Sequence, residues 1–185
     1  MTEIWLVRHG QTDWNRSGRL QGQTDIPLND VGQRQAQELA GKLAGESFAA
    51  IYSSDLSRAY QTAEAIAAAV NLPIQRDLRL REICQGEWEG MDLHQVIKKY
   101  HVDVRESNND AVHSRAPGGE SVAEVAARMF AAAQEISEKH PNSKVLVVTH
   151  GMACATLYCV ANSIPLSKVH DFIPENATPL ITHLN

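Results

Sequence analysis

The stretch that decides the fold lies near the start of the chain, where residues 4–12 read Ile-Trp-Leu-Val-Arg-His-Gly-Gln-Thr. The apolar residues Ile4–Val7 predict a short buried β-strand. Arg8, His9 and Gly10 follow at once, and in parallel α/β sheets reactive groups gather just beyond the carboxyl ends of the strands. A permanent cation beside an imidazole, with a glycine that lets a ligand approach the backbone closely, predicts a phosphate site.

A second apolar strand, predicted at Val145–Thr149, ends in a similar way. It is apolar almost throughout, as expected of a central strand in a parallel sheet, and His150 and Gly151 follow it. Gly151 opens a predicted helix, and the free amides of a helix N-terminus favour anions. The two strands are therefore expected to bring His9 and His150 to the same edge of one sheet.

Two further charged side chains follow predicted elements in the same manner. Arg58 lies in the first turns of the helix that comes after the strand Ala50–Ser53, and Glu82 closes an extended segment predicted at Leu78–Glu82. Because active sites of α/β proteins form at the carboxyl edge of the sheet, both side chains can converge there with the two histidines.

Apolar strands alternate with amphipathic helices along the whole chain, and this order calls for right-handed crossovers. We therefore predict an α/β fold, a three-layer α/β/α sandwich around a mostly parallel central sheet. The 185 residues fit one domain, residues 1–185, with a polar lid or insertion at roughly 91–119. Further strands are expected at 73–76 and 178–183, and helices at 30–43 after the cap Asn29, at 56–70, at 93–100, at 152–161 and from the capping box Ser121–Glu124 onward.

Composition narrows the classes of partner and compartment. A formal net charge of −5 argues against nucleic acid and anionic membranes as partners. Cys84, Cys154 and Cys159 form no CxxC pair, so a reducing, cytoplasmic location is expected. No signal-peptide core and no run of the ~20 apolar residues that a membrane span needs is present. The sequence leaves the oligomeric state open, a homodimer included.

The motifs and their order resemble the histidine phosphatase superfamily, which includes the cofactor-dependent phosphoglycerate mutases. The resemblance covers nearly the whole chain, and it implies a phosphoglycerate mutase-like fold. Several blocks in the family order make coincidence a poor explanation. The blocks are LVRHGQTDWN at 6–15, GRLQGQTDIPL at 18–28, SSDLSRA at 53–59, QTA at 61–63, LRE at 80–82, GEWEG at 86–90, PGGES at 117–121 and VVTHG at 147–151.

The resemblance assigns roles to the clustered side chains. His9 would be the nucleophile that forms a phosphohistidine, and it must be neutral, which the positive charges of Arg8 and Arg58 favour. The two guanidinium groups would hold the non-bridging phosphate oxygens. His150 would be a second phosphate ligand, cationic when substrate is bound. A single arginine such as Arg58 could otherwise be an exposed helix cation paired with Asp55 or Glu64.

Glu82 would be the general acid, which protonates the leaving oxygen and then helps to activate water. Glu87 and Glu89 lie close in sequence and stay alternatives for this role. By resemblance, a further group would bind substrate through amide and backbone donors, although turn chemistry explains some of its members equally well. This group comprises Asn15, Gln21, Gly22 and Gly151.

No metal and no other cofactor is predicted. The chain has no HExxH and no spaced His/Cys/Asp cluster, and the arginines can supply the positive charge that Mg²⁺ supplies in other phosphoryl-transfer enzymes. The partner implied is a small phosphorylated metabolite.

The resemblance implies a phosphatase, that is, a histidine acid-type phosphoric monoester hydrolase, with α-ribazole 5′-phosphate as a candidate substrate. A phosphoglycerate mutase is the first alternative, although the compact interval from Glu82 to Pro117 and the end of the sequence at Asn185, without a tail to close the site, count against it. The others are a non-catalytic phosphoryl-binding module and a protein phosphohistidine phosphatase.

Overall fold

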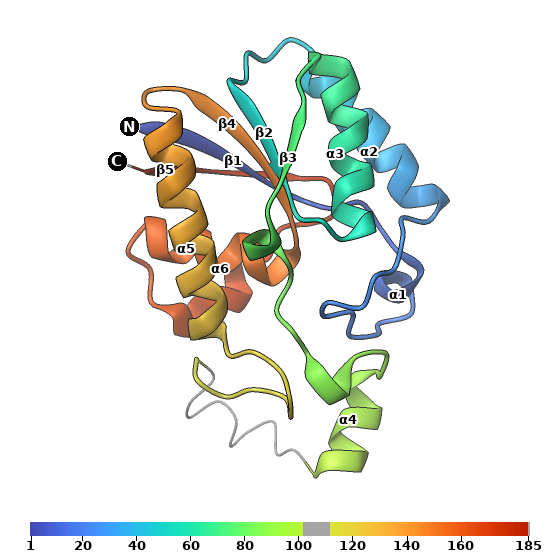
Figure 1. The fold of residues 1–185 in the computed structure, drawn as a ribbon. Helices are drawn as coiled ribbons and strands as arrows, with labels where there is room; N and C mark the ends of the chain where they lie inside the picture. Colours follow the sequence, from blue (N-terminus) through green and yellow to red (C-terminus); the bar gives the residue numbers. More distant parts are fainter. Residues whose placement is uncertain (102–111, 185) are drawn as a thin grey trace.

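A five-stranded sheet runs through the middle of the molecule in the computed structural model, which describes residues 1–101 and 112–184 (Figure 1). The strand order is β3-β2-β4-β1-β5. The first four strands pair in parallel, and β5 runs antiparallel to β1 at the edge. The strands are β1 (Thr2–Arg8), β2 (Ala50–Ser53), β3 (Ile74–Arg76), β4 (Lys144–Thr149) and β5 (Pro179–Leu184).

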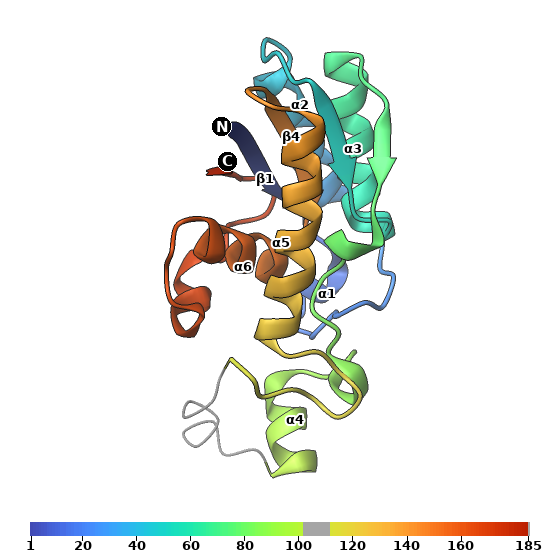
Figure 2. The ribbon, with the colours of Figure 1, turned by 60° about the vertical axis from the view of Figure 1, so that its left-hand side comes forward.

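Helices cover both faces of the sheet, which confirms the predicted three-layer sandwich. One face packs against α2 and α3, and the other against α5 and α6 (Figures 1 and 2). Each side has its own apolar cluster, and β4 contributes to both because its side chains alternate between the faces. The helices are α1 (Asp13–Arg16), α2 (Asp30–Leu43), α3 (Ser57–Val70), α4 (Leu93–Tyr100), α5 (Val122–Lys139) and α6 (Gly151–Ala161), and the 3₁₀ turns are Leu78–Leu80, Gly86–Trp88 and Leu166–Phe172.

The helix starts follow from the capping residues in the sequence. The Asn29 side chain accepts a hydrogen bond from the Gly32 amide at the start of α2. Ser121 and Glu124 form a capping box at the start of α5. Each cap satisfies amides that the first helical turn leaves free. Both predicted helix starts are confirmed.

The prediction of an extended segment at Leu78–Glu82 is wrong, because Leu78–Leu80 forms a 3₁₀ turn. The Asp77 carboxylate accepts a hydrogen bond from the Arg79 amide and so starts the turn, and Leu80 is buried beneath it. A local side-chain-to-backbone bond of this kind competes with extended structure. The turn ends the edge strand β3 and leads the chain toward the carboxyl edge of the sheet.

The described parts of the predicted lid, residues 91–101 and 112–119, lie at the carboxyl end of the sheet, where α4 projects below the strands (Figure 2). Asp92 caps α4 through a capping box with Gln95, which confirms the predicted helix at 93–100. Residues 102–111 of the proposed lid lie outside the described residues. A closing motion and a single domain over 1–185 stay predictions.

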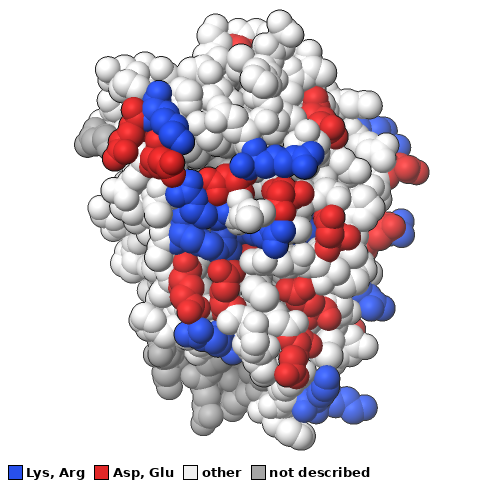
Figure 3. All heavy atoms as spheres, viewed as in Figure 1, with Lys and Arg blue, Asp and Glu red and all other residues white. Residues whose placement is uncertain are grey.

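Acidic and basic side chains alternate over the face formed by α5, β3 and α3 (Figure 3). Two ion pairs there join segments far apart in sequence, Arg79 with Glu135 and Arg81 with Asp55. None of the helices in the described part of the chain is long and apolar enough to cross a membrane.

Candidate active site

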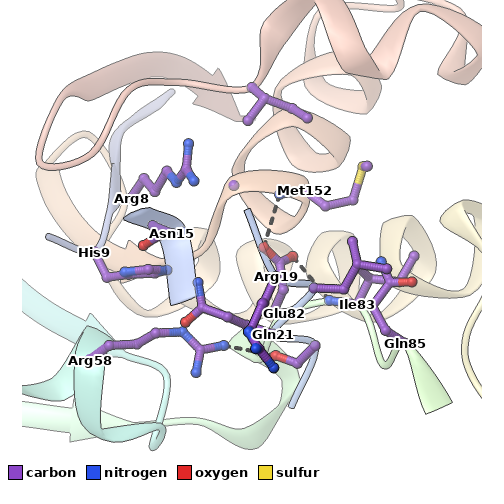
Figure 4. Close-up of a pocket in the computed structure, with 14 residues that line it drawn as sticks. Arg8, His9, Asn15, Arg19, Gln21, Arg58, Glu82, Ile83, Gln85 and Met152 are labelled. Carbon is purple, nitrogen blue, oxygen red and sulfur yellow. Dashed lines mark hydrogen bonds between the residues drawn. The ribbon is translucent and has the colours of Figure 1, made fainter. Parts of the chain in front are cut away.

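A pocket opens at the carboxyl edge of the sheet, where β1 and β4 end (Figure 4). Eight of the nine predicted site residues line it, and His150 is the exception. The parallel registry of β1 and β4 explains the convergence, because Arg8 lies opposite Thr149 at the ends of the two strands. The lining residues are Arg8, His9, Asn15, Arg19, Leu20, Gln21, Gly22, Arg58, Glu82, Ile83, Gln85, Gly151, Met152 and Ile173.

His9 is buried, with 2% of its surface exposed, and its ring has a defined tautomer. Its Nδ1 lies 2.6 Å from the Gly10 carbonyl oxygen, which can only accept, so Nδ1 carries the proton. In the neutral ring the lone pair is therefore on Nε2. Burial, the positive charge of Arg58 and, more weakly, that of Arg8 hold the pKa of His9 well below its usual value, against an opposing hydrogen bond to Gly10. The imidazole is thus neutral and ready to attack an electrophile.

Arg8 directs a guanidinium group into the pocket (Figure 4). One end is fixed, because Nη1 donates to the Pro174 carbonyl at 2.8 Å. Its Nε–H is buried and has no hydrogen-bond partner among the described residues. Leaving a buried charged donor unpaired is costly, so an anion in the pocket is the natural acceptor for this group.

Arg58 is fully buried, which rules out the interpretation as an exposed helix cation. Its Nη1 and Nη2 donate to the carbonyls of Thr24 and Gly22 at 2.8 and 2.7 Å. Asp55, its expected surface partner, instead pairs with Arg81. The guanidinium group is therefore held beside His9 by hydrogen bonds to two backbone carbonyls.

His150 is fully buried and is not among the residues that line the pocket, and its role as a direct phosphate ligand stays a prediction. Its Nδ1 accepts a hydrogen bond from Arg58 Nε at 3.2 Å, so Nε2 carries the proton and donates to Ser54 Oγ at 2.9 Å. Burial, followed by the charges of Arg58 and its neighbours, lowers the pKa of His150 well below its usual value. In this state His150 is neutral, packs edge-on against His9 at 5.2 Å between ring centroids, and orients Arg58.

The Glu82 carboxylate faces the pocket from the segment after the 3₁₀ turn (Figure 4). It accepts hydrogen bonds from the amides of Met152 and Ala153 at the start of α6, both at 3.2 Å, and from Ile83 at 3.0 Å. The two alternative acids point elsewhere: Glu87 accepts from the Tyr100 hydroxyl, and Glu89 is not in the pocket lining. Glu82 is the carboxylate of the three that lines the pocket.

Asn15 and Gln21 both turn their amide oxygens toward Thr12. Asn15 Oδ1 accepts from the Thr12 amide, and Gln21 Oε1 accepts from the Thr12 hydroxyl at 3.0 Å. Their NH₂ groups are thus the ends that can donate to an anion. Gly22 has φ +52°, and a Cβ there would collide with the Glu89 carboxylate, so this position favours glycine.

Gly151 lines the pocket at the first residue of α6, where a Cβ would approach the side chains of Ile173 and Arg8. Arg19 also lines the pocket, although it was not among the predicted site residues. Its guanidinium group donates to the Gly90 carbonyl at 2.9 Å. Ile173, which reaches the pocket from the segment before β5, was not predicted either. Arg19 lies inside the quoted GRLQG block, which was a usable signal, whereas nothing in the sequence marks Ile173.

No group of three or more His, Cys, Asp and Glu side chains is placed to hold a metal ion in the described part of the chain. The positive charge of the pocket comes from its arginines, two of which flank His9.

The fold and the pocket together define an α/β protein with an arginine-lined pocket at the carboxyl edge of its sheet. The chain belongs to the histidine phosphatase superfamily, branch 1, whose sequence model matches residues 4–184. The predicted family and the phosphoglycerate mutase-like fold are thus confirmed.

Relatives with similar sequences carry the names of different enzymes, a phosphatase and a probable mutase among them. The chain is 38% identical over 184 residues to phosphoserine phosphatase 1 of Hydrogenobacter thermophilus, covering 100% of this chain and 87% of that protein. It is 39% identical over 165 residues to a probable phosphoglycerate mutase GpmB of Yersinia enterocolitica, covering 89% and 77%.

Solved structures with the same fold include a mycobacterial glucosyl-3-phosphoglycerate phosphatase in complex with VO₃. It superposes with a TM-score of 0.89 at 31% identity and covers 97% of this chain and 90% of that one. The α-ribazole phosphatase from Shigella flexneri also gives a TM-score of 0.89, at 26% identity, with 99% and 91% covered.

Proposed function

We propose that the chain is a metal-independent phosphomonoesterase that hydrolyses a small phosphorylated metabolite through a phosphohistidine on His9. The observation that carries this proposal is the state of His9, a neutral imidazole whose Nδ1–H is held by Gly10. Its remaining nitrogen has a free lone pair in a pocket that it shares with Arg8 and Arg58. A neutral nucleophile beside two permanent cations suits attack on a phosphate dianion.

The reaction takes two displacements. His9 Nε2 attacks phosphorus, the bond to the leaving oxygen breaks, and Glu82 gives that oxygen its proton. Water then attacks the phosphohistidine, the P–N bond breaks, and Glu82 takes the proton of the water. Arg8 and Arg58 bind the non-bridging oxygens through both steps, with donors from Asn15, Gln21, Gly22 and Gly151 around them.

The substrate proposed first is α-ribazole 5′-phosphate, supported by the likeness to the α-ribazole phosphatase structure. Phosphoserine and phosphoglycerate derivatives are the other candidates, in line with the names of the relatives. A mutase that returns the phosphoryl group to substrate is the second function, favoured by the identity to the probable GpmB. The cysteines Cys84, Cys154 and Cys159 are free thiols, which supports a cytoplasmic location.

Phosphate release from a panel of monoesters tests the proposed function. The panel contains p-nitrophenyl phosphate, α-ribazole phosphate, phosphoserine, sugar phosphates and 3-phosphoglycerate, the last also assayed for isomerisation with a bisphosphate primer. Release from at least one metabolite supports a phosphatase, and the highest kcat/KM identifies the substrate. Isomerisation without release identifies a mutase, and neither activity leaves a phosphoryl-binding module.

Chelators are expected to leave turnover unchanged. Arg8 and Arg58 already supply the charge that neutralises the transferred group, so kcat/KM with and without EDTA should agree within about twofold. A loss of activity that added Mg²⁺, Mn²⁺ or Zn²⁺ restores would contradict the metal-independent mechanism.

A further inference from the structure

Arg128 on α5 divides its hydrogen bonds between the segment that carries Glu82 and the carboxylate of Glu120. A guanidinium group has five N–H donors, and all five are used. Nη1 donates to the carbonyls of Arg79 and Arg81 at 2.7 and 2.6 Å, and Nη2 donates to the carbonyl of Glu82 at 3.0 Å. The remaining bonds, from Nη2 and Nε, go to the two carboxylate oxygens of Glu120 at 2.9 and 2.8 Å.

Glu120 fixes the same segment from its other end. Its Oε2 accepts from the Cys84 amide at 2.8 Å, and its own amide donates to the Cys84 carbonyl at 2.9 Å. Partial burial by itself raises the pKa of the Glu120 carboxyl, but the hydrogen bonds from Arg128 and Cys84 outweigh it and leave that pKa below its usual value. Glu120 is therefore ionised, and the pair with Arg128 is a doubly hydrogen-bonded, charge-assisted contact.

The segment 79–84 has little regular structure of its own to hold it. Beyond the 3₁₀ turn that ends at Leu80 it belongs to no strand or helix until Gly86. The carbonyl of Leu80 is held separately, by the Thr149 hydroxyl at 2.6 Å. The carbonyls of residues 79–82 are thus all tied to α5 or to the end of β4, and the side chain of Glu82 reaches the pocket from this tethered backbone (Figure 4).

We propose that Arg128 and Glu120 are positioning residues, whose paired side chains fix the backbone on both sides of Glu82 and so aim its carboxyl group at the leaving oxygen. The proposal rests on the assignment of Glu82 as general acid. Proton transfer requires the acid within hydrogen-bond reach of the oxygen, and a displacement of about 1 Å can cost 10²-fold in rate. Neither Arg128 nor Glu120 lines the pocket, so both act through Glu82.

The experiment compares aryl phosphates of similar shape but different leaving-group basicity, p-nitrophenyl phosphate and p-methoxyphenyl phosphate. The parameter is kcat/KM, because it reports the step that expels the leaving group. In Arg128→Lys the charge stays, but an ammonium group has three donors and cannot form the planar five-bond set. We expect kcat/KM to fall about 10-fold more for the methoxy than for the nitro compound, a part of the ~10²–10⁴-fold of general acid catalysis.

Two further variants are measured beside Arg128→Lys. Glu120→Gln removes the charge of the partner and should give the same selective loss, which keeps the test valid if Arg128→Lys folds poorly. Glu135→Gln is the matched control, because Glu135 also ties α5 to this region, through the Arg79 side chain at 2.6 Å, without contacting the backbone of residues 81–84. Its kcat/KM ratio between the two substrates should equal that of the wild type.

Glu82→Gln distinguishes a failure of Glu82 as general acid from a failure of the positioning role of Arg128 and Glu120. If this variant loses no more on the methoxy than on the nitro compound, Glu82 is not the acid and the proposed mechanism fails. If it shows the selective loss, while Arg128→Lys and Glu120→Gln are unchanged or fall equally on both substrates, the acid assignment stands and the positioning role is wrong. A selective loss on the methoxy compound that all three variants share supports the positioning role.

Discussion

Replacement of His9 by alanine is expected to lower kcat/KM on the best phosphomonoester by about 10⁵-fold, the scale seen when a nucleophile is removed from a covalent mechanism. The expected effect is large because the variant has no lone pair to attack phosphorus, while the phosphate can still bind to Arg8 and Arg58. The fold should persist, since His9 follows β1 and its backbone amide still donates to the Thr149 carbonyl.

The measurement is steady-state hydrolysis, with circular dichroism and a melting curve to verify folding. His170→Ala is the matched control, because His170 is exposed in the 3₁₀ turn Leu166–Phe172, outside the pocket lining, and should keep wild-type turnover. A folded His9→Ala protein that retains more than about a tenth of wild-type kcat/KM would contradict the assignment of His9 as nucleophile.

The second large effect is expected at Arg58. In Arg58→Met the pocket loses a cation beside His9, and kcat/KM should fall about 10³-fold, as when a preorganised donor to the transition state is removed. The carbonyls of Gly22 and Thr24 lose their donor at the same time. Each buried unpaired group costs about 1–3 kcal/mol, so the melting temperature should fall as well.

Arg58→Lys distinguishes charge from geometry. The ammonium group keeps the charge but cannot donate to both carbonyls and to His150 Nδ1 in the plane that the guanidinium group defines. We expect a loss of about 10²-fold, smaller than for methionine. Arg34→Met, at an exposed position of α2, is the control for removal of a cation. Equal activity of Arg58→Met and Arg34→Met would show that Arg58 does not bind the phosphate.

Much of the fold could be predicted because local signals agree with the final packing. The apolar run at 145–149 becomes the central strand β4, and helix α2 runs from Asp30 to Leu43 as its cap and periodicity predict. The pocket position of His9 follows from the same logic, since a residue directly after a parallel strand must lie at the carboxyl edge.

The orientation of His150 could not be predicted in this way. Its place in the chain resembles that of His9, yet its two nitrogens are bound by Ser54 and Arg58, residues more than ninety positions away. Only the three-dimensional arrangement decides whether a histidine at a strand end faces the pocket or supports its wall. The sequence pattern predicts that His150 lies at the carboxyl edge of the sheet, but it does not predict the hydrogen-bond partners of His150.

The place of Ile173 in the pocket was equally hidden, because Ile173 comes from the segment before β5. The pocket position of Glu82 was predicted, but the contacts of Arg128 that hold its segment in place of regular structure were not. Such positions depend on long-range contacts of side chains with backbone, for which hydrophobic periodicity carries no signal. The 3₁₀ turn at Leu78–Leu80 is a smaller case, in which the Asp77 cap overrides an extended pattern.

If the phosphoryl group passes through His9, the phosphohistidine can be trapped during turnover. The enzyme is mixed with excess p-nitrophenyl phosphate, quenched in alkali within the first turnover, and digested for mass spectrometry of the peptide that contains His9. We expect one acid-labile phosphoryl group on His9, absent from His9→Ala. Turnover under the same conditions with a phosphoryl group on another residue, or with repeated quenches that show none on His9, would contradict it.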